Sequence, residues 1–129
     1  MPVDPMAMAK QKKEQMKFMV ENLRRFYQAG GKIVIGTDLI HSTDFSREAV
    51  IPVVELRHLA SIGMELQEII KTGTLYAAQV IGTEKEEGTI TVGKEANLIA
   101  VPGEVDLGFE ALRSVPFVMH YGTVIKNQL

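Results

Sequence analysis

The sequence contains no cysteine and no tryptophan, and neither acidic nor basic side chains dominate its charge. The lack of cysteine excludes a disulfide framework and every thiolate metal site in this chain. The formal net charge of −2 argues against nucleic-acid binding, because neutralising phosphates needs a basic surface. No apolar run approaches the roughly 20 residues that a helix needs to cross a bilayer, and residues 1–5 lack the basic and apolar parts of a signal peptide. We therefore expect a cytoplasmic protein that binds neither nucleic acid nor membranes.

Several well-known catalytic and nucleotide-binding motifs are also missing. The sequence has no H-x-H, H-E-x-x-H, G-x-S-x-G or G-x-G-x-x-G pattern and no Walker A lysine. Gly30-Gly31-Lys32 precedes a strand-like segment rather than a helix, so it cannot cradle a phosphate as a P-loop does. The length of 129 residues suffices for one ordinary globular domain.

The first thirty residues show the period of an amphipathic helix. Apolar side chains recur three and four residues apart between Met16 and Tyr27, and lysine, arginine and glutamate occupy much of the remainder. Gly30 and Gly31 end the pattern, because glycine takes the left-handed conformation at little steric cost. We expect this helix to pack on a sheet; the alternative is a soft, methionine-rich binding surface.

A short apolar run follows the helix directly. Ile33, Val34 and Ile35 are contiguous β-branched residues, which is typical of a strand buried on both faces. A strand over residues 32–38 and a polar loop over 39–50 complete one αβ step of an α/β protein. Such a strand needs parallel partners for its backbone hydrogen bonds.

Three short helices separated by glycines are predicted next. They begin near Pro52, near Glu65 and after Thr74, which we expect to cap the third, and glycines 63, 73 and 82 interrupt or close them. Their inward-facing residues are predicted as Val53 or Val54, Leu56, Leu59, Ala60 and Ile62, then Leu66, Ile69 and Ile70, then Leu75, Ala78 and Ile81.

From residue 89 the period changes to two. Strands are predicted over 89–92 and 97–101, with a turn at Gly93-Lys94 between them. A helical turn over 107–112 leads to a hairpin of strands 115–120 and 123–126 around Tyr121-Gly122. This β-rich tail is predicted to form a layer separate from the αβ step.

Asp38 is the residue whose position points most clearly to chemistry. It ends the predicted strand, and functional groups of α/β proteins gather at that edge of a sheet. A carboxylate there can bind a metal ion or take a proton from metal-bound water; the alternative is a loop aspartate that caps a turn. His41 and Asp44 could join it in a metal cluster, but catalytic zinc usually draws ligands from separated segments, so a solvated polar loop is favoured. His58 is expected on a helix surface, and His120 in the terminal hairpin.

Four stretches in sequence order resemble the C-terminal part of the metal-dependent amidohydrolase superfamily. Residues 29–38 resemble its last barrel strand, which ends in G-T-D, and 55–64 with 74–82 resemble the helices that follow. Residues 88–98 resemble its G-x-I-x-x-G-K-x-A-D-L strands, and 118–124 resemble its closing hairpin. The likeness is nearest to the prolidase-like and imidazolonepropionase-like members, which cleave peptide-like or cyclic amide bonds.

The resemblance implies an α/β fold: the last αβ step of a (β/α)8 TIM-type barrel with trailing helices, plus C-terminal strands of a small β-sandwich. The barrel would be incomplete, with residues 1–83 belonging to it and 84–129 to the sandwich. Asp38 would be a catalytic residue and a metal ligand or proton shuttle, His41 a lesser candidate for substrate binding, and the cofactor of the complete enzyme a divalent metal, expected to be zinc.

Departures from the family pattern limit what this chain can do. The family's H-x-H, its mid-barrel lysine or histidine and two further histidines have no counterpart here, and Asn97 replaces the aspartate of A-D-L. We therefore expect the C-terminal segment of an enzyme that hydrolyses an amide or cyclic amide C–N bond with metal-activated water. The chain alone should hold no metal tightly and should be inactive. The alternatives are a subunit that complements a chain carrying the metal histidines, and a non-catalytic, self-associating module.

The expected partners follow from the same reading. The complete enzyme would act on a small-molecule amide or peptide-like substrate. The chain itself should form a homo-oligomer or associate with the missing N-terminal portion, because unpaired strand edges and uncovered apolar faces promote association.

Overall fold

The computed structural model describes residues 4–36, 52–106 and 108–129. Two compact units make up the chain, Met1–Lys32 and Ile33–Leu129, and each is described by itself. The second unit is an α/β unit in which short helices precede a three-stranded antiparallel sheet. The predictions for residues 37–51 concern a part of the chain outside the described residues.

The first unit is one helix, α1 (Pro5–Gln28), as predicted. Asp4 caps it: a carboxylate oxygen accepts a hydrogen bond of 2.9 Å from the Met6 N–H. Proline at the first helical position suits this start. Gly30, with φ at +86°, provides the left-handed residue just beyond the end.

The predicted strand over 32–38 is wrong for the residues that can be judged. Residues 33–36 form no strand, and Ile33, Val34 and Ile35 are half-buried rather than fully buried. One backbone bond joins this segment to the helices, from the Ile35 N–H to the Thr72 carbonyl oxygen at 3.3 Å. The sequence pattern of a buried parallel strand is present, but a ladder needs neighbouring strands, and the described part of the chain offers it none.

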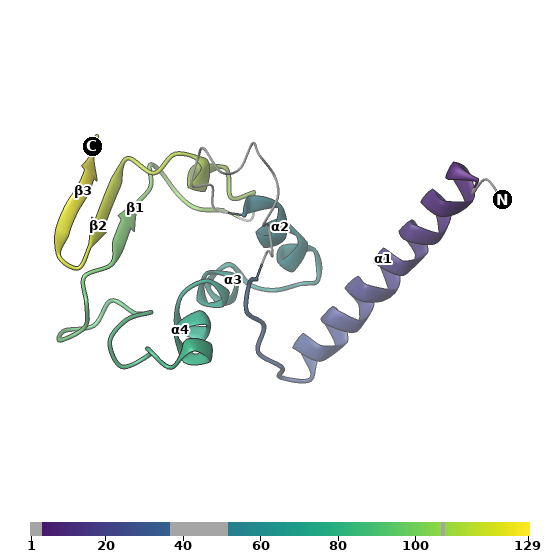
Figure 1. Ribbon diagram of the computed structural model, residues 1–129, viewed down its shortest axis with the longest axis horizontal. Coiled ribbons are helices and arrows are strands. Elements are labelled where there is room, and N and C mark those ends of the chain that lie inside the picture. Colours follow the sequence, from purple (N-terminus) through teal and green to yellow (C-terminus); the bar gives the residue numbers. More distant parts are fainter. Residues whose placement is uncertain (1–3, 37–51, 107) are drawn as a thin grey trace. The chain divides into compact units, whose positions relative to one another are not determined.

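Three short helices hold the core of the second unit: α2 (Val53–Ser61), α3 (Leu66–Thr72) and α4 (Leu75–Ile81), shown in Figure 1. The positive φ angles of Gly63 and Gly82 confirm the predicted breaks after α2 and α4. The buried apolar side chains are Val53, Leu56, Leu59, Ile62, Met64, Ile69, Ala78 and Phe109. Most come from the predicted inward faces, and Val53 rather than Val54 is the buried member of its pair.

Three predictions for these helices are wrong. Ile70 and Ile81 were expected inward but are exposed. Thr74 makes no side-chain cap for α4; its hydroxyl instead donates to the Ile70 carbonyl oxygen at 2.9 Å, back towards α3. A residue between two helices can hydrogen-bond either to the end of the first or to the start of the second. Here the hydroxyl donates to a carbonyl of the first helix.

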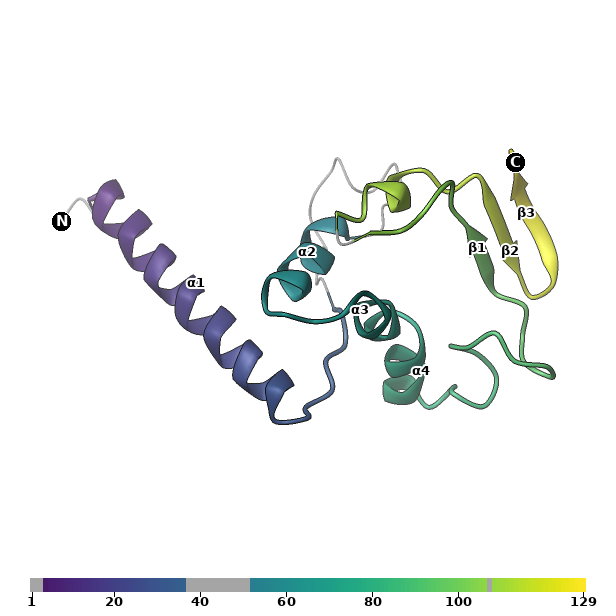
Figure 2. The same cartoon turned by 180° about the vertical axis from the view of Figure 1, so that it is seen from behind.

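The sheet consists of β1 (Leu98–Ala100), β2 (Phe117–His120) and β3 (Thr123–Asn127), in that order and antiparallel throughout (Figure 2). Tyr121 and Gly122 both have positive φ, 46° and 74°, the geometry of a two-residue hairpin turn that matches the twist of the strands. The predicted hairpin is confirmed. β3 is the outer strand, and all five of its residues are exposed.

The predicted strand over 89–92 is wrong: these residues form a bend and the start of a turn and make no ladder bonds, and Ile90 and Val92 are exposed. Their alternation is real, but no described strand lies beside them. The helical turn expected over 107–112 is a 3-10 helix, Glu110–Arg113, tied to α2 by an ion pair between Glu110 and Arg57. Among the described residues, no helix has the length and apolar character needed to cross a bilayer.

Candidate functional site

The residues predicted to carry chemistry lie in the part of the chain that the structure does not describe. Asp38, His41 and Asp44 all fall within residues 37–51. What is described is the approach to Asp38: residues 33–36, tied at Ile35 to the end of α3. Thr72, which accepts that bond, is fully buried, and its hydroxyl donates to the Ile69 carbonyl oxygen at 2.6 Å.

A metal site does not fit the residues that are described. Across residues 4–36, 52–106 and 108–129, no group of three or more His, Asp or Glu side chains could hold an ion. His58 is exposed on α2, as predicted. His120 ends β2, where its Nδ1 lies 2.9 Å from the Asn97 side-chain oxygen. His120 thus lies in the terminal hairpin, as predicted.

The second unit has an apolar groove of about 650 Å³. One wall comes from α3 and α4, through Ile70, Ala77 and Ile81. The other comes from the segment 87–97 and the first residues of β1, with Ile90 and Ile99. Clefts of this volume are common ligand or peptide sites. The lining also includes polar residues: Thr74, Glu87, Thr89, Glu95 and Asn97.

Gly88 brings the two walls together. Its φ is +85°, and a Cβ built there would lie 2.8 Å from the Ala78 Cβ and 3.2 Å from the Thr74 carbonyl oxygen. Only glycine allows the backbone of this segment to lie so close to α4.

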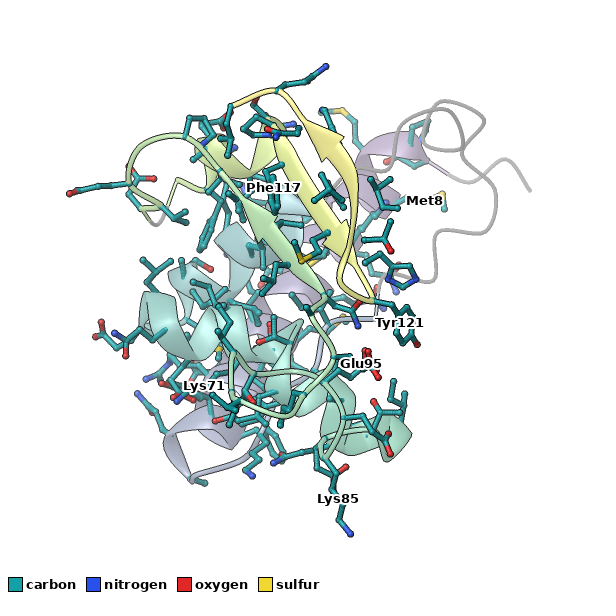
Figure 3. All side chains as sticks on the ribbon, turned by 90° about the vertical axis from the view of Figure 1, so that its left-hand side faces the viewer. Met8, Lys71, Lys85, Glu95, Phe117 and Tyr121 are labelled. Atoms are coloured by element: carbon teal, nitrogen blue, oxygen red, sulfur yellow. The ribbon has the colours of Figure 1, made fainter. Side chains whose placement is uncertain are left out.

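The polar end of the groove is organised by Asn97. Its side-chain NH2 donates to the Glu87 carboxylate at 3.3 Å, and its side-chain oxygen accepts from the Tyr121 backbone N–H at 2.9 Å. Glu87 also accepts from the Thr83 hydroxyl at 2.7 Å. One side chain therefore joins the segment before β1, the start of β1 and the β2–β3 turn; Figure 3 labels Tyr121 and Glu95 in this region.

Lys94 holds together the acidic segment, residues 84–87, which leads to the polar end of the groove. Its ammonium donates to the backbone oxygens of Glu84 and Glu87 at 2.6 and 3.1 Å. The Glu95 N–H donates to the Glu86 carbonyl oxygen at 2.8 Å, so the segment folds back on itself.

Sequence reasoning did not identify this groove. Ile70 and Ile81 carried the helical period, which indicates a buried face but not which element covers it. Asn97 was noticed as a departure from A-D-L, yet its contact with Glu87, ten residues earlier, leaves no signal in local spacing. Gly88 could have been found, because an isolated glycine beside strand-like residues often marks a close backbone approach.

A profile of the amidohydrolase family matches residues 12–127. A solved Xaa-Pro dipeptidase with methionine bound in its active site is 27% identical, with a TM-score of 0.69 over 84% of this chain and 25% of its own. A solved prolidase in complex with N-methylphosphonate-L-proline is 25% identical, with a TM-score of 0.73 over 98% of this chain and 30% of its own.

An amidohydrolase from Thermotoga maritima, at 21% identity and a TM-score of 0.64, shares the fold over 84% of this chain and 26% of its own. The chain thus spans between a quarter and a third of the solved proteins it resembles.

Proposed function

The chain belongs to the amidohydrolase family, and from this we propose that it is the C-terminal segment of a metal-dependent hydrolase that cleaves an amide or cyclic amide C–N bond. The observation that carries the proposal is the family match over residues 12–127 in a chain spanning only 25–30% of the similar dipeptidase and prolidase. The substrate class follows those two relatives: a small peptide-like or amide molecule.

We assign one residue of this chain to the catalytic centre of the whole enzyme, Asp38, as a metal ligand or proton acceptor. Its place after residues 33–36, in a stretch that resembles the family's G-T-D strand end, supports the assignment. His41 remains a lesser proposal for substrate contact. In the whole enzyme a divalent metal, for which we favour zinc, would make hydroxide available at neutral pH. Because the described residues do not fit a metal, we derive no catalytic step from them.

We also propose a division of the chain into two domains and a cellular compartment for the whole enzyme. Residues 1–83 would close the TIM-type barrel, and residues 84–129, which include the sheet, would belong to the β-sandwich. Residues 33–36 make no strand-to-strand hydrogen bonds. This is consistent with a strand whose partner strands belong to another part of the whole enzyme. We place the whole enzyme in the cytoplasm.

A complementing subunit is the second candidate, in which a separate chain carries the metal histidines. The fully exposed outer strand β3 and the unpaired segment 89–92 favour it, because both could accept strands from another polypeptide. A non-catalytic, self-associating module would use the same surfaces.

The first test is an activity assay on purified residues 1–129 with one equivalent of zinc and an Xaa-Pro dipeptide. We expect no hydrolysis above the buffer rate, and turnover would contradict the proposal. The DNA upstream of the Met1 codon is the second test. An in-frame segment encoding H-x-H supports the segment proposal, whereas a separate gene encoding it supports the complementing subunit.

The role of Asp38 is tested in the assembled hydrolase. We expect Asp38→Asn to lower kcat at least about 100-fold, in line with loss of a general acid–base group. Asp44→Asn, six residues later in the predicted polar loop, is the matched control and should stay within about threefold of the parent. Equal activity of the two variants would show that Asp38 is not in the catalytic centre.

A further inference from the structure

The groove presents apolar side chains to solvent. Ile70, Ile81 and Ile90 are 44%, 68% and 90% exposed, although they line the same depression. A contiguous apolar surface of this kind is typical of an interaction site, since scattered single residues would not share a groove. Its polar end carries the carboxylates of Glu87 and Glu95.

The two units carry opposite charge. Residues 1–32 contain seven Lys and Arg against three Asp and Glu, a formal net charge of +4. Residues 33–129 contain seven against thirteen, a formal net charge of −6. Such a division of charge favours association between the basic unit and the acidic one, and it weakens as salt rises.

Helix α1 has the pattern of a ligand for a groove. Met16, Met19 and Leu23 recur at the spacing by which amphipathic helices anchor in apolar grooves. Lysines flank this stripe at positions 12, 13 and 17. Described residues 4–32 contain no second helix or strand for the stripe to pack on, although helices in proteins owe most of their stability to packing of an amphipathic face.

We propose that the groove of the second unit binds helix α1 of a second copy of this chain, and that two chains exchange their helices reciprocally. Methionines and Leu23 would fill the apolar walls, while the flanking lysines would face Glu87 and Glu95. The methionine side chains suit this task because they adapt to irregular apolar surfaces. This inference does not depend on the proposed hydrolase function, and its test uses no substrate.

The experiment measures association of the full chain by sedimentation equilibrium. We expect a dimer that weakens as ionic strength rises. Ile81→Glu in the groove and Leu23→Glu in the helix should each raise the dimer Kd at least about 100-fold. Val80→Glu, at an apolar position on α4 that is 72% exposed and does not line the groove, is the matched control and should leave the Kd unchanged.

Mixing the two variants gives the decisive result. A pair made of one Ile81→Glu chain and one Leu23→Glu chain keeps one intact groove and one intact helix. We therefore expect the mixture to form heterodimers at concentrations where each variant alone is monomeric. Far-ultraviolet circular dichroism checks that both variants keep the parent's helix content.

Three results would overturn the proposal. A parent chain that is monomeric at about 100 μM would show that no such dimer forms. Variants that remain dimeric would place the interface elsewhere on the molecule. A mixture that stays monomeric would show that helix and groove of different chains do not meet.

Discussion

Replacing Asn97 by aspartate tests the hydrogen-bonded junction at the polar end of the groove. The family pattern has aspartate at this place, but here the side-chain NH2 donates to the Glu87 carboxylate at 3.3 Å. Asn97→Asp preserves the oxygen that contacts the Tyr121 N–H and the His120 Nδ1, and puts a second carboxylate beside the first. The substitution that restores the aspartate of the family pattern should therefore destabilise this chain.

The magnitude follows from the distance. Two unit charges 3.3 Å apart repel by about 5 kcal/mol at an effective dielectric constant of 20 and by about 1 kcal/mol in bulk water. Both side chains are partly exposed, so the lower part of this range applies. The lost hydrogen bond adds about 1 kcal/mol. We expect the free energy of unfolding at pH 7 to fall by about 2–3 kcal/mol.

The pH dependence separates charge repulsion from a lost contact. Neighbouring carboxylates raise the pKa at which the pair loses its last proton, so the destabilisation is present above that pKa and is relieved as pH falls towards about 4. Urea unfolding at pH 7 and pH 4, followed by circular dichroism, measures it. Adding Glu87→Gln to Asn97→Asp restores a donor and should recover at least about 1 kcal/mol. An equal loss at both pH values, or no rescue, would refute the reasoning.

Two further predictions concern the backbone and the first helix. Gly88→Ala should lower the free energy of unfolding by about 2–4 kcal/mol, from left-handed backbone strain plus the contact with Ala78. A Cβ at Gly82 meets no atom within 4 Å, so Gly82→Ala should cost only the strain. Equal losses of stability in urea unfolding would contradict the close approach at Gly88. Hydrogen bonds from Arg24 and Arg25 lower the pKa of Glu21 to about 2. Its contribution to helix α1 is therefore complete above the ordinary carboxyl pKa and is lost as pH falls through about 2, a change in ellipticity that Glu21→Gln should lack.

Local signals predicted the local parts of this structure. The end of α1 before Gly30, the breaks at Gly63 and Gly82 and the turn at Tyr121-Gly122 all rest on backbone conformations that neighbouring residues specify. The hairpin that joins β2 to β3 is confirmed for the same reason.

Predictions that needed a distant partner were less successful. Residues 33–36 and 89–92 have strand-like sequences but form no ladder, because pairing is a property of two segments. Ile70 and Ile81 lie on apolar helix faces that the described residues do not cover. Phe109 is fully buried with φ at 57°, a conformation unusual for a bulky residue that no sequence pattern indicated. The candidate site was located from the position of Asp38 at the end of the predicted strand and then from the resemblance to a family, and that assignment stays a prediction.

The ammonium of Lys94 holds the turn at residues 84–87 closed by donating to two backbone carbonyl oxygens, those of Glu84 and Glu87. A dissolved cation could take the place of this ammonium between the two backbone oxygens only by binding and dissociating. Because this charge is covalently attached, the segment needs no dissolved ion to stay closed, and chelators should leave its shape intact. Neutralising the amine by acetylation would remove the charge and two of its donors at once. A single lysine thus makes the order of this segment sensitive to amine chemistry and indifferent to metal supply.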